Sequence, residues 1–214
     1  VDAAALAIYS PAGIVVHTGD FKVDYTPVYG DAIDLQRFAE LGKKGVLALM
    51  CDSTNAERQG FTPSEKKLGP VFDMLFEEHK KTRIIIATFA SNVDRVQQII
   101  NTADKFGRKV VVEGRSMVNI IETASNLNRI SIPENTVIDI ERLKNYPKDK
   151  TVIITTGSQG ESMAALSRMA SGMHKKISIG KGDTVIFSSN PIPGNEKAVT
   201  KVINELFKKG ADVI

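Results

Sequence analysis

Residues 84–92 read IIIATFASN, and the apolar residues that follow, from Val93 to Ala103, recur at helical spacing. The first part is a continuous β-branched run with no polar alternation, which is typical of a strand buried on both faces. A buried strand, a short polar loop and a helix in succession predict a parallel sheet with right-handed crossovers. This unit therefore predicts an α/β fold.

The same pattern recurs along most of the chain. Further buried-strand runs lie at Val46–Met50, Val110–Val112, Val152–Thr155 and Val185–Phe187. Apolar residues at helical spacing follow at 68–76 and 198–207, and Gly210 stands where a C-cap glycine belongs. Thr62-Pro63-Ser64-Glu65 predicts a helix start, with an N-cap, a proline in the first turn and a glutamate three residues after the cap. We predict a parallel, Rossmann-like sheet with flanking helices.

The two ends of the chain show a different pattern. Residues 4–9 and 14–18 are short apolar runs joined by Ser10-Pro11-Ala12-Gly13, which predicts a β-hairpin. Residues 211–214 resemble the opening of another strand. A chain that begins and stops inside strands leaves sheet partners unaccounted for. We interpret the sequence as a piece of a larger protein.

Composition excludes several classes of protein. The chain has 214 residues, 42% hydrophobic and 25% charged, close to an average soluble domain, which argues against disordered, collagen-like and disulfide-rich proteins. No apolar run approaches the roughly 18 residues of a membrane span, so no membrane partner is expected. Cys51 is the only cysteine, which excludes a cysteine-based zinc site and fits a reducing compartment.

Net charge says little about partners. The charge is +3, which is too small to argue for nucleic acid by itself. Lys175-Lys176, Lys181 and Lys208-Lys209 are candidates for a basic surface, although short lysine groups are usually solvated surface. Gly180-Lys181-Gly182 lacks the spacing of a nucleotide-binding loop, so a nucleotide-triphosphate enzyme is disfavoured.

Serine-bearing loops follow the predicted strands. In a parallel sheet, ligands bind outside the carboxyl ends of the strands, where helix N-termini offer N–H groups to phosphate or carboxylate. The candidate residues for a phosphate site are Ser91, Asn92, Gly157, Ser158 and Gln159. The competing interpretation is helix capping, because Ser and Asn are preferred N-cap residues. For the 156–162 loop, phosphate binding and helix capping both stay open, because Gly157 and Gly160 would let the backbone approach a ligand closely.

Two acidic residues stand just after predicted strands. Asp20 follows the second hairpin strand, and Asp52 follows the first buried strand. A carboxylate at such a position is a common metal ligand, but it is as often a turn or cap residue. The three histidines, His17, His79 and His174, show no metal-ligand spacing, so no complete metal site is visible.

Several short segments resemble the ribonuclease J family, of the β-CASP group within the metallo-β-lactamase superfamily. In chain order they are HTGDFK (17–22), CDSTNAE (51–57), ATFASN (87–92), TTGSQGE (155–161), AALSR (164–168) and FSSNPIPG (187–194). Together they span nearly the whole chain. The resemblance implies that residues 1–56 are part of a metallo-β-lactamase αββα domain. This part contains the hairpin, a metal-bridging aspartate and the last strand of that domain. It implies that residues 57–214 are a β-CASP domain, truncated at its return to the first domain.

The resemblance also implies an activity. Members of the family hydrolyse RNA phosphodiester bonds with two zinc ions, as 5′→3′ exonucleases and as endonucleases, in RNA and rRNA processing and decay. Asp20 matches the aspartate that bridges the two metals, and Asp52 matches the acidic residue that supports the active site. Ser91, Asn92, Gly157, Ser158 and Gln159 fall where the β-CASP domain faces the RNA. The implied partner is single-stranded RNA, preferably 5′-monophosphorylated, and the implied whole protein is a cytoplasmic homo-oligomer.

Parts of the family pattern are missing from the sequence. The H-x-H-x-D-H cluster and the later S-G-H-A and H-G-E segments are absent. We therefore expect the chain alone to be catalytically silent and to hold no zinc tightly. Two alternatives stay open, a non-catalytic RNA- or phosphate-binding module and a small-molecule metallohydrolase of the same superfamily. A substrate-facing domain argues against the second alternative, because a small-molecule enzyme needs a pocket and not a channel wall.

Overall fold

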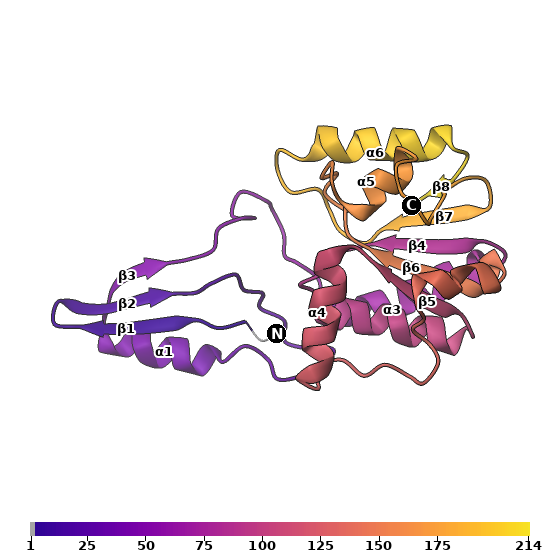
Figure 1. The fold of residues 1–214 in the computed structure, drawn as a ribbon. Helices are drawn as coiled ribbons and strands as arrows, with labels where there is room; N and C mark the ends of the chain where they lie inside the picture. The colour runs from indigo at the N-terminus through magenta and orange to yellow at the C-terminus, as the bar shows by residue number, and fades with distance from the viewer. Residues whose placement is uncertain (1–2) are drawn as a thin grey trace. The chain divides into compact units, whose positions relative to one another are not determined.

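The computed structural model describes residues 3–214 and divides into two compact units. The first unit ends at Lys67, and the second unit spans Leu68–Ile214. Figure 1 colours the first unit indigo to violet and the second from magenta to yellow. The domain boundary expected after residue 56 stays a prediction.

The first unit contains a small mixed sheet. Within its described residues, the strands are β1 (Leu6–Ser10), β2 (Gly13–His17) and β3 (Val46–Met50), in the order β1-β2-β3. β1 and β2 pair antiparallel, which confirms the predicted hairpin, and β2 pairs with β3 in parallel. The crossover carries α1 (Leu35–Lys44), whose Leu41 packs on Ile14 and Val16. The sequence interpretation missed this helix, which begins where the Asp34 carboxylate accepts the Arg37 N–H.

The second unit is built on a five-stranded, all-parallel sheet. Its strands are β4 (Arg83–Ala87), β5 (Lys109–Glu113), β6 (Thr151–Thr155), β7 (Asp183–Phe187) and β8 (Asp212–Val213), in the order β5-β6-β4-β7-β8. The predicted parallel α/β fold is confirmed. The strand predicted from residues 211–214 is β8. Ile84, Ile85 and Ile86 are fully buried, as expected for a strand covered on both faces.

Helices cover both faces of this sheet (Figure 1). On one face α2 (Leu68–Glu78), α3 (Val93–Lys105) and α4 (Arg115–Asn126) pack on residues such as Ile84 and Ile86. On the other face α5 (Ala165–Ala170) and α6 (Glu196–Lys208) pack on residues such as Ile85 and Val185. Short 3-10 turns lie at η1 (Glu65–Lys67), η2 (Ile140–Asn145) and η3 (Lys148–Lys150). No helix among the described residues is long and apolar enough to cross a membrane.

The helix predicted to start at Thr62 begins later than expected. The structure has the 3-10 turn η1 first, and α2 starts only at Leu68. The cause is a polar contact with an earlier segment: the Ser64 hydroxyl donates to the Thr26 carbonyl, and the Glu65 N–H donates to the Asp24 carboxylate. These bonds tie Ser64 and Glu65, two residues of the expected first turn, to the 24–26 segment.

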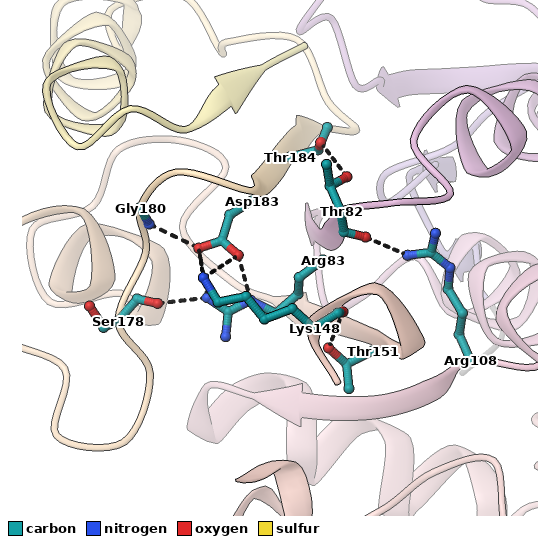
Figure 2. Close-up of polar contacts among 9 residues, drawn as sticks. All are labelled: Thr82, Arg83, Arg108, Lys148, Thr151, Ser178, Gly180, Asp183 and Thr184. Atoms are coloured by element: carbon teal, nitrogen blue, oxygen red, sulfur yellow. Dashed lines mark hydrogen bonds and ion pairs between the residues drawn. The ribbon is translucent and has the colours of Figure 1, made fainter. Parts of the chain in front are cut away.

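A buried ion pair joins the first residues of β4 and β7 (Figure 2). The Arg83 guanidinium donates to both carboxylate oxygens of Asp183, at 2.9 and 2.7 Å. Arg83 also donates to the Ser178 carbonyl, and the Gly180 N–H and the Lys148 ammonium bind the same carboxylate. Asp183 is 1% exposed and lies at the edge where the strands begin. Its carboxylate has no access to water there, and protein donors supply its hydrogen bonds.

Candidate functional site

The structure brings Asp20 and Asp52 to the same edge of the first unit's sheet. β2 and β3 run in parallel, with His17 paired to Met50 at their carboxyl ends. Asp20 lies three residues after β2 and is exposed, and Asp52 lies two residues after β3 and is half-buried. Adjacent parallel strands lie about 4.8 Å apart, so the two loops leave the sheet side by side.

Thr18 joins these two loops. It is 7% exposed, and its N–H donates to the Met50 carbonyl at 3.0 Å. Its hydroxyl donates to the Gly19 carbonyl at 2.7 Å and accepts the Asp52 N–H at 3.1 Å. One buried hydroxyl therefore fixes the backbone that leads to Asp20 and the backbone of Asp52 at once.

Asp52 is held as a carboxylate. Hydrogen bonds from the Thr54 hydroxyl at 2.7 Å and the Thr54 N–H at 3.0 Å reach the same oxygen of Asp52. They lower the pKa of the Asp52 carboxyl below its ordinary value. Asp52 is half-buried, so its carboxylate keeps some access to solvent.

The described residues do not assemble a metal site. Within residues 3–214, no group of three or more His, Cys, Asp or Glu side chains lies close enough to hold a metal ion. The Nδ1 atom of His17, three residues before Asp20, accepts the Gly19 N–H at 3.0 Å. A catalytic zinc takes three protein ligands. Asp20 and Asp52 are two carboxylates and do not supply the three protein ligands that a catalytic zinc needs.

Replacing Thr18 tests the bridge. We expect Thr18→Val to raise the hydrogen-exchange rate of the Asp52 amide about tenfold, because the lost hydroxyl leaves that N–H without its acceptor at a net cost of about 1–1.5 kcal/mol. Amide exchange measured by NMR on the 214-residue chain reads this directly. Thr18→Ser keeps the hydroxyl and should retain the slow exchange. Equal exchange in the two variants would show that the hydroxyl does not hold Asp52.

In the second unit, the loops after β4 and β6 lie at one edge, because these two strands are neighbours. Ser91 is exposed, so its hydroxyl is accessible to a ligand. Asn92 caps α3 by accepting the Arg95 N–H at 3.1 Å, the capping role that competed with phosphate binding in the sequence interpretation. Contact of Ser91 and Asn92 with RNA stays a prediction.

The loop after β6 is more buried than its sequence indicated. Ser158 is 2% exposed, Gln159 is 4% exposed, and Gly157 is buried. The Gln159 amide nitrogen donates to the Asn190 carbonyl and the Ser189 hydroxyl, and its oxygen accepts from the Ile192 N–H and the Asn195 side chain. Gln159 thus ties its own loop to the 188–195 loop that follows β7. RNA contact by Gly157, Ser158 and Gln159 stays a prediction, and in this conformation the side chains of Ser158 and Gln159 face protein.

Gly160 allows the backbone of the same loop to lie directly against the first turn of α6. Its φ is +75°, and a Cβ there would lie 2.4 Å from the backbone carbon of Ala198 and 2.6 Å from the nitrogen of Val199. No side chain fits this approach. The sequence pattern predicts that Gly160 allows close approach of a ligand. In the structure, the backbone that approaches Gly160 is that of α6.

Gln159→Leu keeps the size of the side chain and removes its four polar contacts. We expect the free energy of unfolding to fall by about 1–2 kcal/mol and amide exchange at Ile192 to speed up, because the Ile192 N–H loses its acceptor. Urea unfolding and amide exchange measure the two effects. Gln36→Leu, on the exposed helix α1, is the matched control and should change stability by no more than about 0.5 kcal/mol. A Gln159 variant as stable as this control would contradict the bridging role.

Sequence reasoning missed two groups near these sites. Thr18 precedes Asp20 in the same segment, but nothing in its spacing says that its hydroxyl bonds across to Asp52. His174 lies in a loop, but its side chain is only 4% exposed and its Nε2 lies 3.1 Å from the Glu113 carboxylate. Its Nδ1 accepts the N–H groups of Lys176 and Ile177, so neither ring nitrogen is open to a ligand.

Comparison with known proteins identifies the family. Residues 81–206 match the family model described as "Ribonuclease J, beta-CASP domain". The chain is 49% identical over 213 residues to Ribonuclease J of Synechocystis sp., with 100% of this chain and 33% of that protein covered. It is 50% identical over 209 residues to Ribonuclease J 1 of Streptococcus pyogenes, with 98% of this chain and 37% of that protein covered. Ribonuclease J of Mycobacterium tuberculosis is 47% identical over 213 residues, with 100% and 38% covered.

The chain thus spans about a third of the length of the curated relatives it matches. A solved structure titled as a protein of unknown function from Enterococcus faecalis V583 shares the fold, with a TM-score of 0.58 at 16% identity, covering 98% of this chain and 48% of that chain. The family match runs from the loop before β4 into α6 and covers β4, β5, β6 and β7 of the five-stranded sheet. The chain therefore belongs to the ribonuclease J family, and residues 81–206 are its β-CASP domain.

Proposed function

We propose that the chain is the part of a ribonuclease that joins one edge of the catalytic domain to the β-CASP domain. The reaction is hydrolysis of RNA phosphodiester bonds, both as a 5′→3′ exonuclease and as an endonuclease, in cytoplasmic RNA processing and decay. The observation that carries the proposal is identity of 47–50% along essentially the whole chain to proteins named Ribonuclease J.

Asp20 and Asp52 are the residues of this chain proposed to act in the reaction. They lie at neighbouring strand ends, and Thr18 fixes the backbones of both loops. Asp20, which is exposed, is the proposed ligand shared by two zinc ions of the whole protein. Asp52, whose ionised form is stabilised by the two hydrogen bonds from Thr54, is proposed to orient a ligand or the attacking water. The metals would activate that water, and their remaining ligands are proposed to come from outside the described residues.

The proposed substrate is single-stranded RNA, preferably with a 5′-monophosphate, and the proposed whole protein is a homo-oligomer. Of the predicted RNA residues, Ser91 has the most accessible side chain. We propose that the 214-residue chain alone is inactive, because Asp20 and Asp52 do not make a metal site by themselves.

The test compares the whole protein with its Asp20→Asn variant on 5′-monophosphorylated RNA. If Asp20 supports the catalytic metals, we expect hydrolysis to fall about a hundredfold or more, since a lost metal contribution of about 3 kcal/mol is about two orders of magnitude in rate. Gel analysis separates mononucleotide products from internal cleavage products. Asp31→Asn, an exposed aspartate of the same unit, is the control and should keep full activity. Unchanged hydrolysis in Asp20→Asn would reject the assigned role.

A non-catalytic RNA-binding module is the second candidate function. The absence of an assembled metal site among the described residues favours it. The two candidates differ in one result: RNA hydrolysis by the whole protein that a chelator abolishes supports the nuclease, and binding without hydrolysis supports the module. A small-molecule metallohydrolase has no support from the relatives, which are all named as ribonucleases.

A further inference from the structure

Basic residues gather at the edge of the second unit's sheet where the strands begin, here called the amino edge. The segments that lead into the five strands are residues 79–83, 106–109, 140–150, 171–183 and 209–212. They contain thirteen Lys and Arg residues against four Asp and Glu, a local charge of 13 − 4 = +9 in a chain of net charge +3. The segments that leave the strands, residues 88–95, 113–116, 156–164 and 187–197, contain three basic and four acidic residues. Positive charge is therefore concentrated at one edge.

The lysines form a row across the sheet. Lys150 directly precedes β6, Lys81 lies two residues before β4, and Lys181 lies two residues before β7. These three strands are consecutive in the sheet, and Arg83 pairs in register with Asp183, so Lys81 and Lys181 enter from equivalent positions. With strands about 4.8 Å apart, the three attachment points span about 10 Å. Lys109 of β5 and Lys209 before β8 continue the row on either side.

These three charges are available to a partner. Lys81, Lys150 and Lys181 are exposed, and none of them forms an ion pair within residues 3–214. The helix dipole explains lysines in the last turn of a helix, but Lys81 and Lys181 lie beyond the helices that precede them. The nearest buried acid does not neutralise the row, because the Asp183 carboxylate is already bound by Arg83 and Lys148 (Figure 2).

We propose that the amino edge binds the phosphate backbone of single-stranded RNA, through Lys81, Lys150 and Lys181, as a contact separate from the carboxyl-edge loops. A row of flexible ammonium groups binds phosphate charge and not base edges, so the contact is sequence-independent. Lysine suits this role because it is a flexible point charge with three donors. The choice of RNA among polyanions rests on the proposed function.

The test is the salt dependence of RNA binding by the 214-residue chain. Anisotropy of a labelled oligouridylate of about 15 nucleotides with a 5′-hydroxyl is measured over a range of salt concentrations, with chelator present to prevent hydrolysis. Each phosphate contact to a single strand contributes about 0.7 to the slope of log K against log salt. We expect the triple variant Lys81→Gln, Lys150→Gln, Lys181→Gln to lower the magnitude of that slope by about 2.

The matched control removes the same charge elsewhere. Lys43, Lys66 and Lys201 are exposed lysines outside both the amino edge and the carboxyl-edge segments, and their Gln variants together should leave the slope unchanged. Arginine at positions 81, 150 and 181 keeps the charge and should keep the slope. Equal loss in both Gln triples, no loss in either, or no binding by the unchanged chain would each overturn the proposal. Hydrolysis by the whole protein is a separate readout, so failure of the proposed nuclease function would not be confused with failure of this surface.

Discussion

Asp183→Asn should lower the free energy of unfolding of the second unit by about 3–5 kcal/mol. Removing one partner of a buried ion pair leaves the other charge without compensation, and Arg83 is 6% exposed beneath the sheet edge. The same carboxylate also accepts the Gly180 N–H, so the turn into β7 loses its anchor. Hydrogen exchange of the buried amides of Ile84–Ile86 reports the opening of this unit and measures the loss.

Two further variants distinguish the cost of leaving a buried charge unpaired from the cost of losing one ion-pair contact. Asp73→Asn breaks the Asp73–Lys105 pair, whose side chains are 40% and 62% exposed, and should change stability by no more than about 1 kcal/mol. Replacing both members of the buried pair, Arg83→Met with Asp183→Leu, should be less damaging than Asp183→Asn, because no unpaired charge remains. If the single and double variants are equally unstable, packing and not charge dominates at this position.

Gly160→Ala is the second substitution expected to have a large effect. A Cβ at φ +75° costs about 1–2 kcal/mol in backbone energy. The new atom would also meet the backbone of Ala198 and Val199, and backbone cannot move aside as a side chain can, which adds about 1–3 kcal/mol. We expect a total loss of about 2–5 kcal/mol in unfolding free energy, measured by urea unfolding.

Gly107 provides the control for Gly160. It has a similar φ of +64°, but nothing lies within 4 Å of the position that its Cβ would take. Gly107→Ala should therefore cost only the backbone part, about 1–2 kcal/mol. The difference between the two variants measures the close approach of the loop to α6. Equal losses would mean that α6 shifts freely and that the loop is not seated on it.

The sheet could be predicted from the sequence because its strands are apolar on both faces. Runs such as Ile84–Phe89 and Val152–Thr155 predict the interior of a parallel sheet, and the structure places β4 and β6 there. The same prediction was wrong for Val46–Met50, because all five residues of β3 are exposed and β3 lies in the other sheet. Helix α1 escaped prediction because its pattern is mostly polar, with only Phe38 and Leu41 packing on the sheet. The predicted start of α2 was wrong because Ser64 and Glu65, in the expected first turn, bond to the 24–26 segment about forty residues earlier.

The site could be predicted only as positions in the chain. The ends of predicted strands located Asp20 and Asp52 in the chain, and only the structure shows that their loops leave neighbouring strands at one edge. The polar bridges could not be predicted, because Thr18 bonds to a group 34 residues away and Gln159 to groups 30–36 residues away. Residue type also misled: Ser158 and Gln159 have the chemistry of ligand contacts, yet they are buried at 2% and 4% exposure. Whether a polar side chain faces solvent or a neighbouring loop is decided by tertiary packing.

The central place of β4 sets the order in which the second unit can assemble. β4 is the first of its strands to leave the ribosome, but its two neighbours are β6 and β7, which begin 68 and 100 residues later. Pairing of such distant segments makes folding slow, and both backbone edges of β4 stay unpaired until β6 has been synthesised. During synthesis this segment is a site at which nascent chains can associate with one another. The strand that is most protected in the native protein is therefore its most vulnerable segment while the chain is incomplete.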